Sequence, residues 1–364
     1  MSATSYPRTT EDWQGVFIRH LADALAESGQ CELGLWAPRG PLNDYISYRC
    51  DPDDETWLAE LANRGGIAHL LKGNKVRALG TGVSLLRRLN AAYQKHAAQV
   101  DLFHVNWLQN ALPLTAIDRP AVISILGTDF KLLALPGMKP LVRRMLRGRR
   151  AALVPNADWM APRLQEDFGD LATISPIPFG IDDRWYNVRR MPEFAPRCWL
   201  VVARLTRAKL GPLLEWGEQL FSSGERELHF IGPNQEQLRL PSWINYHGPA
   251  SPDVIARDWF PRATGLLTLS QHSEGRPQAL MEALAAGLPI IASDIDAHRD
   301  LLAPMQAGLL VSSADSFGTA ISQLEQKGFN AAMSATSRAA AREAFGTWSD
   351  CAERYLNVYR AVTA

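Results

Sequence analysis

Segments typical of strands and segments typical of helices alternate along nearly the whole chain, in two successive series. The first series runs from Val16 to Pro155 and the second from Cys198 to Ser293. Short apolar runs that alternate with stretches of helical spacing are typical of parallel sheets covered by helices. In a chain of 364 residues, two such series predict an α/β protein with two doubly wound, Rossmann-like domains.

The individual elements can be assigned from the pattern. In the first series we expect strands at 31–37, 100–106, 121–126 and 151–155, and helices at 16–28, 84–99 and 138–150. In the second series we expect strands at 198–203, 228–231, 244–246, 265–269 and 289–293, and helices at 212–222 and 278–286. The proline-rich stretch from Ile177 to Pro196 is typical of a linker.

These elements predict four segments. An N-terminal domain is expected at 1–178, a linker at 179–196, a C-terminal domain at 197–344 and a final helix at 345–364. Two placements are open for the final helix, which is rich in aromatic residues. It either caps the second domain or packs back on the first.

Composition excludes several classes of protein. The net charge is zero, so the protein as a whole is not a binder of nucleic acid. The four cysteines are widely spaced without a CxxC pair, which argues against a disulfide scaffold and a structural zinc site. The first residues lack an apolar signal core, and no uncharged run has the length of a spanning helix. We expect a cytoplasmic protein, at most peripheral at the inner face of the membrane.

One part of the first half is strongly basic. Between Leu61 and Ala157 there are fifteen Lys or Arg and three acidic residues, a net charge of +12. Six of these cations fall in the expected helix at 138–150, interleaved with apolar residues. This helix is either an amphipathic helix with a solvated basic face or an attachment to an anionic membrane surface.

A pair of carboxylates marks the second half. Glu274 lies in a loop of Ser, Gly and Pro, whereas Glu282 is the only charge between Ala279 and Leu288. A carboxylate in so apolar a run requires hydrogen-bond donors. Since side chains of a helix lean toward its N-terminus, Glu282 would face an anion bound there, as a nucleotide diphosphate requires. The alternative is a buried Glu satisfied by a neighbouring Arg or by backbone groups.

A second charged element follows the strand at 198–203. Arg204 and Lys209 come at the carboxyl end of that strand, where doubly wound sheets bind ligands. Two cations there can neutralise a diphosphate leaving group. Arg207 lies between them and could compete for that role, and a solvated basic turn is the plainer interpretation.

Together these segments resemble the retaining glycosyltransferases of the GT4 family. The resemblance covers Cys198 to Asp300 and includes the Arg-Leu-x-x-x-Lys turn, Glu-Gly-x-Pro, the spacing of the two glutamates, and Ala-Ala-Gly-Leu-Pro-Ile-Ile-Ala-Ser at 285–293. It implies the GT-B fold, two doubly wound domains that face each other across a cleft. It also implies a nucleotide-sugar donor as substrate, no cofactor and no metal.

The resemblance assigns roles to individual residues. Arg204 and Lys209 would hold the donor diphosphate, Glu274 would touch the sugar, and Glu282 would hold the ribose. Residues that surround these positions in the matched segment would line the donor site as well: Gly275, Arg276, Gln278 and Ala279.

The first half resembles the family more loosely. Gly15 resembles the glycine of the loop beneath the donor phosphate. Where the family often has His-Gly-x-Asp, this chain has Leu126-Gly127-Thr128-Asp129, so the histidine is replaced by Leu126. His104, at the end of a neighbouring strand, is a candidate for its contribution, and a structural histidine is the alternative. We expect His104 and Asp129 on the acceptor side.

The predicted function is therefore transfer of a sugar, with retention at the anomeric carbon, from a nucleotide-diphosphate sugar to a saccharide or lipid-linked saccharide, in synthesis of cell-surface polysaccharide or glycolipid. Two alternatives remain open. One is a catalytically weak relative that binds a nucleotide sugar as a partner protein, and the other is a nucleotide-sugar epimerase. The nucleotide base, the sugar and the acceptor are not specified by these motifs.

Overall fold

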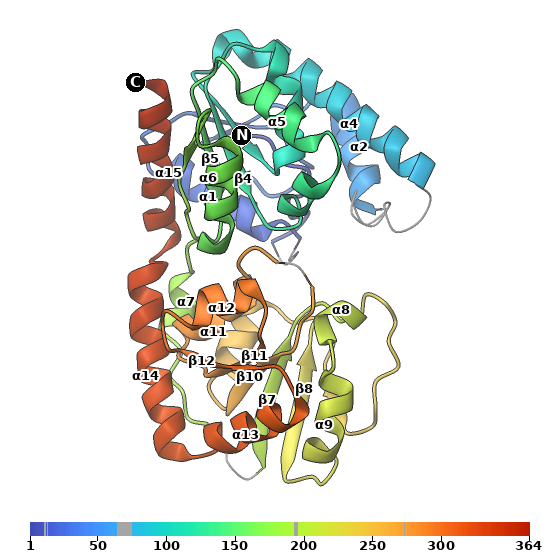
Figure 1. The fold of residues 1–364 in the computed structure, drawn as a ribbon, viewed down its shortest axis with the longest axis vertical. Coiled ribbons are helices and arrows are strands. Elements are labelled where there is room, and N and C mark those ends of the chain that lie inside the picture. Colours follow the sequence, from blue (N-terminus) through green and yellow to red (C-terminus); the bar gives the residue numbers. More distant parts are fainter. Residues whose placement is uncertain (11, 13, 64–74, 193–195, 273) are drawn as a thin grey trace. The chain divides into compact units, whose positions relative to one another are not determined.

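The computed structural model describes residues 1–10, 12, 14–63, 75–192, 196–272 and 274–364 (Figure 1). It divides into two compact units, unit 1 with residues 1–180 and 348–364 and unit 2 with residues 181–347. The described sheets are all parallel, which confirms the predicted α/β class. Arg64 and Lys72 of the basic stretch, and Ser273 next to Glu274, lie outside the described residues.

The main sheet of unit 1 has four described strands. Its order is β3 (Phe103–Asn106), β4 (Ala121–Ile125), β5 (Ala151–Pro155) and β6 (Thr173–Ile174), and β1 (Leu33–Leu35) pairs separately with β2 (Ile46–Tyr48). Ser2 forms parallel bridges with both Trp36 and Val105, so the first residues lie between the two sheets. The main helices are α1 (Val16–Glu27), α2 (Pro52–Asn63), α4 (Lys75–His96), α5 (Met138–Leu146), α6 (Ala161–Phe168) and α15 (Trp348–Thr363).

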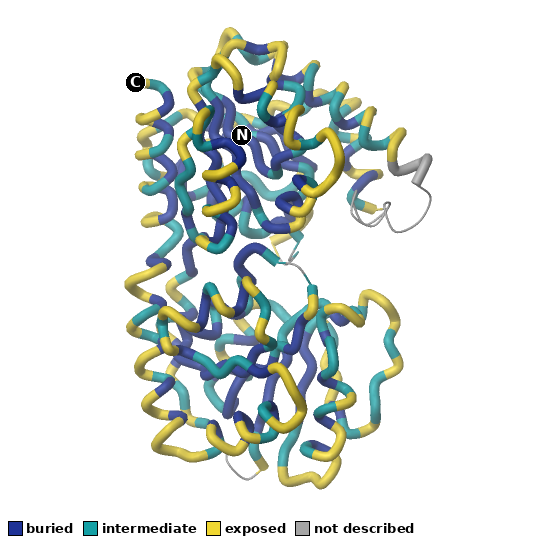
Figure 2. Tube along the Cα trace, viewed as in Figure 1, coloured by how far each residue is buried: buried dark blue, intermediate teal, exposed yellow. Residues whose placement is uncertain are grey.

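Unit 2 is built on a six-stranded sheet. Its order is β12 (Gly308–Val311), β11 (Ile290–Ser293), β10 (Gly265–Thr268), β7 (Arg197–Val202), β8 (Arg226–Ile231) and β9 (Ile244–Tyr246). The central strands are the most deeply buried (Figure 2). The helices are α7 (Asp183–Tyr186), α8 (Arg207–Leu210), α9 (Leu213–Phe221), α10 (Pro252–Val254), α11 (Gln278–Ala285), α12 (Asp296–Leu302), α13 (Ala314–Leu324) and α14 (Lys327–Ala344).

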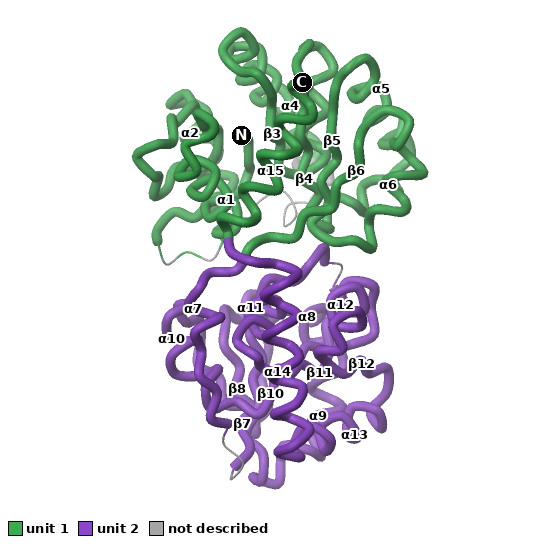
Figure 3. Tube along the Cα trace, turned by 90° about the vertical axis from the view of Figure 1, so that its left-hand side faces the viewer, with its two compact units in different colours: residues 1–180, 348–364 green, residues 181–347 purple. Residues whose placement is uncertain are grey.

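The final helix, α15, lies in unit 1 beside α1 (Figure 3). Its aromatic residues enter the core of that unit. The Tyr355 hydroxyl lies 2.8 Å from the Ser124 hydroxyl on β4, and Tyr355 is fully buried. The last helix of the chain is therefore part of the same compact unit as its first residues.

Two helices differ most from their expected bounds. Helix α5 ends at Leu146 rather than at Arg150, because Arg147 has extended backbone angles and Gly148 adopts a positive φ of 75°. Helix α4 begins at Lys75, before the expected start at Ser84. Strand β12 and helices α12, α13 and α14 were not expected at all.

Candidate donor site in unit 2

The turn after β7 places Lys209 against the end of β10. Thr206 caps α8, since its side chain accepts a hydrogen bond from the Lys209 backbone N–H at 3.2 Å. Gly211 ends this helix with a φ of 52°, and a Cβ atom there would lie 2.0 Å from the Leu269 carbonyl oxygen. Only glycine fits this close approach. The Ala208 carbonyl also accepts the Gln271 N–H at 2.8 Å, so α8 is fixed to the chain that follows β10.

Lys209 and Glu274 form a largely buried ion pair. The ammonium nitrogen lies 2.5 Å from a Glu274 carboxylate oxygen. The exposed fractions of the two side chains are 17% and 11%. Burial alone would raise the pKa of Glu274, but the charge and hydrogen bond of Lys209 outweigh burial and lower it. The Ser270 hydroxyl donates a further hydrogen bond to the same oxygen at 3.2 Å. Glu274 is therefore ionised, and its carboxylate is held in place by Lys209 and Ser270.

Helix α11 begins beside this pair. Pro277 is the residue before its first turn, and no described side chain caps that turn. The N–H groups at Gln278 and Ala279 therefore lie at a helix start that suits an anion such as a phosphate. Gly275, just ahead of the helix, is buried.

Glu282 lies on α11, one turn beyond Gln278. Its side chain is half-buried, and burial raises its pKa to about 8. A hydrogen bond from the Gln278 amide and the charge of Arg184 oppose this rise in part, and Asp182 adds to it. Arg184 is itself paired with Asp182 at 2.9 Å and with Asp253 at 2.7 Å. The Glu282 carboxyl can thus accept further hydrogen bonds, and the two hydroxyls of a ribose would be suitable donors.

The Arg276 guanidinium, expected to line the donor site, is paired within the protein. Its guanidinium donates a hydrogen bond to Asp300 on α12 at 2.7 Å, and both side chains are nearly buried. The guanidinium also lies over the Phe345 ring, 6.0 Å from its centroid. Arg276 therefore fastens the start of α11 to α12. Arg204, on the same turn as Lys209, is half-buried.

The residues expected on the acceptor side are in unit 1. The two ring nitrogens of His104 lie 2.5 Å from the Tyr359 hydroxyl and 2.8 Å from the Ser124 hydroxyl. Burial lowers the pKa of His104 to about 3, with a smaller effect from the N-terminal amine. The contacts of His104 are those of a structural histidine, the alternative interpretation of the sequence.

Asp129 is buried as well. Its two carboxylate oxygens each accept a backbone N–H at 2.9 Å, one from Leu126 and one from Leu108. Burial raises its pKa, and these backbone hydrogen bonds lower it in part. Asp129 thus closes the turn after β4. Gly15 immediately precedes α1 with a φ of 70°, and a Cβ atom there would lie 2.7 Å from the backbone of Ser5 and Tyr6.

Neither a metal cluster nor a spanning helix is found among the described residues. No group of three or more His, Cys, Asp or Glu side chains there is placed to hold a metal ion. Asp294 and Asp296, which form a short Asp-x-Asp pattern, both pair with Arg299. None of the described helices combines the length and apolar composition that crossing a membrane requires.

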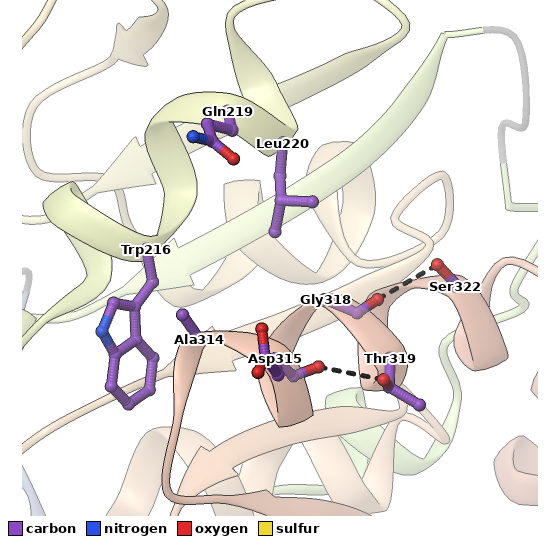
Figure 4. Close-up of a pocket in the computed structure, with 8 residues that line it drawn as sticks. All are labelled: Trp216, Gln219, Leu220, Ala314, Asp315, Gly318, Thr319 and Ser322. Carbon is purple, nitrogen blue, oxygen red and sulfur yellow. Dashed lines mark hydrogen bonds between the residues drawn. The ribbon is translucent and has the colours of Figure 1, made fainter.

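Unit 2 also has an open groove of about 580 Å³ between α9 and α13 (Figure 4). Trp216 and Leu220 line one side, and Asp315 and Thr319 line the other. The lining contains no Lys or Arg, so this groove does not suit a diphosphate. Neither Lys209 nor Glu274 lines this groove.

Four residues that the sequence reasoning missed complete the surroundings of Glu274. They are Ser270, Ser293, His298 and Asp300. Ser270 and Ser293 could have been noticed, because each comes at or just after the carboxyl end of an expected strand. His298 and Asp300 carry no such signal, since α12 was not expected.

Comparison with known proteins agrees with this geometry. Residues 199–327 match the model of the glycosyl transferases group 1 family. Comparison with curated protein sequences gives no match. Among solved structures, the chain is similar to sucrose-phosphate synthase from Thermosynechococcus elongatus, with a TM-score of 0.72 and 15% identity over 95% of this chain and 92% of that one.

Two other similar structures cover almost the whole chain. A trehalose-6-phosphate synthase studied for glycosyl transfer with retention has a TM-score of 0.70 and 12% identity, covering 97% of this chain and 98% of that one. The Anabaena protein HepE, solved with UDP and glucose, has a TM-score of 0.66 and 11% identity, covering 98% and 100%. At such identities the likeness concerns the fold. The chain has the GT-B fold of these glycosyltransferases, and residues 199–327 of unit 2 match the glycosyl transferases group 1 family.

Proposed function

We propose that this protein transfers a sugar, with retention at the anomeric carbon, from a nucleotide-diphosphate sugar to a saccharide or lipid-linked saccharide acceptor. The observation that carries the proposal is the buried Lys209–Glu274 pair next to the start of α11. The solved structures with UDP and glucose and with a retaining mechanism, which share the fold, support the choice of donor and stereochemistry. GT4 membership and a role in polysaccharide or glycolipid synthesis belong to the same proposal.

Each group has a place in this chemistry. When the bond between the anomeric carbon and the diphosphate oxygen breaks, negative charge develops on that oxygen. Lys209 and Arg204 would stabilise that charge, and the N–H groups at the start of α11 would bind the phosphates. Glu274 would orient the sugar, and Glu282 would bind the ribose. Because two cations follow β7 at this position, we also propose that transfer requires no metal ion or other cofactor.

The experiment is a product analysis. The protein is incubated with UDP-glucose, GDP-mannose or ADP-glucose and a mixture of saccharide acceptors, and the products are followed by NMR. The proposal predicts release of the nucleoside diphosphate and a glycoside with the anomeric configuration of the donor. An inverted product would contradict retention. An altered nucleotide sugar without any acceptor would indicate an epimerase, and binding without turnover would indicate a partner protein.

We further propose that part of the basic surface of unit 1 binds an anionic membrane. Half of the cations expected there are used within the protein, since Lys139 pairs with Asp167, Arg143 with Asp170, and Arg149 with four backbone carbonyls. The residues left exposed in and around α5 combine charge with apolar surface. They include Lys131, Leu135, Leu141, Arg144, Arg147 and Arg150, and this set suits a peripheral contact with lipid.

A further inference from the structure

A fully buried histidine lies close to the proposed donor site. His298, on α12, has no exposed surface. Its Nδ1 atom lies 2.9 Å from the Ser293 carbonyl oxygen and 3.2 Å from the Ser293 hydroxyl. Because a carbonyl oxygen can only accept, Nδ1 must carry the proton. The Nε2 atom is then an acceptor, and it has no hydrogen-bond partner among the described residues.

The hydrogen bonds continue from Ser293 to Glu274. The Ser293 hydroxyl donates to the Ser270 carbonyl at 2.5 Å. The Ser270 hydroxyl accepts the His272 N–H at 3.1 Å and donates to the Glu274 carboxylate at 3.2 Å. The Ser293 hydroxyl therefore fixes the backbone of Ser270, and the hydroxyl of Ser270 in turn fixes the Glu274 carboxylate.

Helix α12 makes a second contact with the same part of the chain. Asp300, two residues beyond His298, accepts a hydrogen bond from Arg276 at 2.7 Å. The helix therefore holds Ser270 indirectly through His298 and holds Arg276 directly through Asp300. These two positions flank Glu274 in the sequence, so both contacts limit the freedom of its carboxylate.

We propose that His298 is a positioning residue of the donor site, which acts through Ser293 and Ser270 to orient the Glu274 carboxylate toward the donor sugar. This inference rests on the proposed function, because that function gives Glu274 its sugar. The role requires only the Nδ1–H donor. A merely structural position would be better filled by an apolar side chain of similar size, since a buried Nε2 atom without a partner costs folding free energy.

The first test separates sugar binding from nucleotide binding. Calorimetry gives the dissociation constants of UDP-glucose and of UDP for the wild type, His298→Leu, Ser293→Ala and the double variant. If Glu274 is mispositioned, UDP-glucose binding weakens about tenfold while UDP binding is unchanged. His298 and Ser293 act through the same series of contacts, His298–Ser293–Ser270–Glu274, which we call the relay. The double variant should therefore lose no more affinity for UDP-glucose than either single variant. Equal losses for both ligands, or losses that add, would overturn the proposal.

Two controls sharpen this comparison. His298→Asn retains an N–H donor for the Ser293 carbonyl and should restore UDP-glucose binding to within about threefold of the wild type. His229→Leu removes another buried histidine of unit 2, one whose ring nitrogens contact His247 and Glu227 instead. This control should leave the ratio of the two dissociation constants unchanged.

The second test needs no ligand, so failure of the relay and failure of the proposed function can be told apart. Nitrogen NMR of the protein alone should find the proton of His298 on Nδ1, and a proton on Nε2 instead would overturn the relay. Carbon NMR should find that the pKa of Glu274 is higher in Ser293→Ala than in the wild type, since Ser270 is no longer aligned. An unchanged pKa would also overturn it. If both NMR results are as expected but no nucleotide sugar binds the wild type, the relay is supported and only the proposed function is contradicted.

Discussion

The ammonium group of Lys209 lies 2.5 Å from the carboxylate of Glu274, a residue 65 positions later in the chain, and both side chains are mostly buried. Removing one partner of such a pair leaves the other charge buried and uncompensated. We expect Lys209→Met to lower the free energy of unfolding at pH 7 by about 3 kcal/mol. Urea titration followed by circular dichroism measures this difference.

The double variant provides the matched control. In Lys209→Met/Glu274→Gln the buried charge is absent, so much of the lost stability should return. Because the pKa of Glu274 is lowered in the folded protein, the stabilisation from the pair is present at neutral pH and is lost as pH falls through that pKa. A double variant that is less stable than Lys209→Met would show that the ion pair does not account for the effect.

Glu282 should release a proton when a nucleotide binds. Its pKa is raised to about 8, so at pH 7 the carboxyl is mostly protonated. Ribose hydroxyls that donate to the carboxylate favour its ionised form and lower this pKa. Calorimetry of UDP binding in two buffers with different ionisation enthalpies should therefore detect release of close to one proton, about 0.5–0.9 per nucleotide. In Glu282→Gln the proton release should vanish.

Arg204 and Arg207 form a matched pair for testing the diphosphate contact. Both lie on the turn after β7, but Arg204 is half-buried whereas Arg207 is exposed. We expect Arg204→Ala to lower turnover by about 100-fold, as removal of one group that stabilises developing charge does in other enzymes. Arg207→Ala should retain turnover within about threefold. Steady-state rates of nucleoside diphosphate release measure both, and equal rates in the two variants would refute the assignment of Arg204.

His104 should make unit 1 sensitive to acid. Its pKa is lowered to about 3 by burial. Between pH 6.5 and pH 3, His104 is therefore protonated in the unfolded chain and neutral in the folded protein. Its contribution to stability is therefore complete above pH 6.5 and declines as pH falls toward 3. Between pH 7 and 5 we expect the wild type to lose about 2 kcal/mol more stability than His104→Gln. Parallel pH profiles for the two proteins would contradict this.

The exposed basic surface of unit 1 can be tested by sedimentation with liposomes. We expect binding to vesicles that contain phosphatidylserine and none to neutral vesicles, with binding lost at high salt. Arg144→Glu/Arg147→Glu should abolish binding. Arg207→Glu/Arg239→Glu makes the same change of charge at exposed positions in unit 2 and should retain it. Equal binding to neutral and anionic vesicles would end this proposal.

The sequence predicted the central part of unit 2 well because its local signals agree with one another. Strands β10 and β11 are short apolar runs, and Pro277 and Gly287 bracket a helix of otherwise apolar residues around Glu282. Such signals depend only on neighbouring residues. The contact between Lys209 and Glu274 depends on α8 lying against β10, which Gly211 permits, and no local pattern indicates that approach.

Burial was the main property that the sequence did not reveal. His104 was expected on the acceptor side because it ends a strand, and Asp129 because its segment resembles the His-Gly-x-Asp of the family. The structure buries both side chains and satisfies them with protein groups. Arg276 is a similar case, since its partner Asp300 lies on a helix that was not expected. A polar residue at the end of a strand has the same local sequence whether it faces a ligand or the core.

The most direct measurement of the central claim is calorimetric binding of UDP-glucose, GDP-mannose and ADP-glucose to the wild type, to Glu282→Gln and to Lys209→Met. If the segment from Lys209 to Glu282 is the donor site, at least one of these nucleotide sugars binds the wild type. Both variants should then bind it at least about tenfold more weakly, because each loses a hydrogen bond to a charged group. Binding that is undiminished in the folded variants, or absent for all three donors in the wild type, would contradict the account.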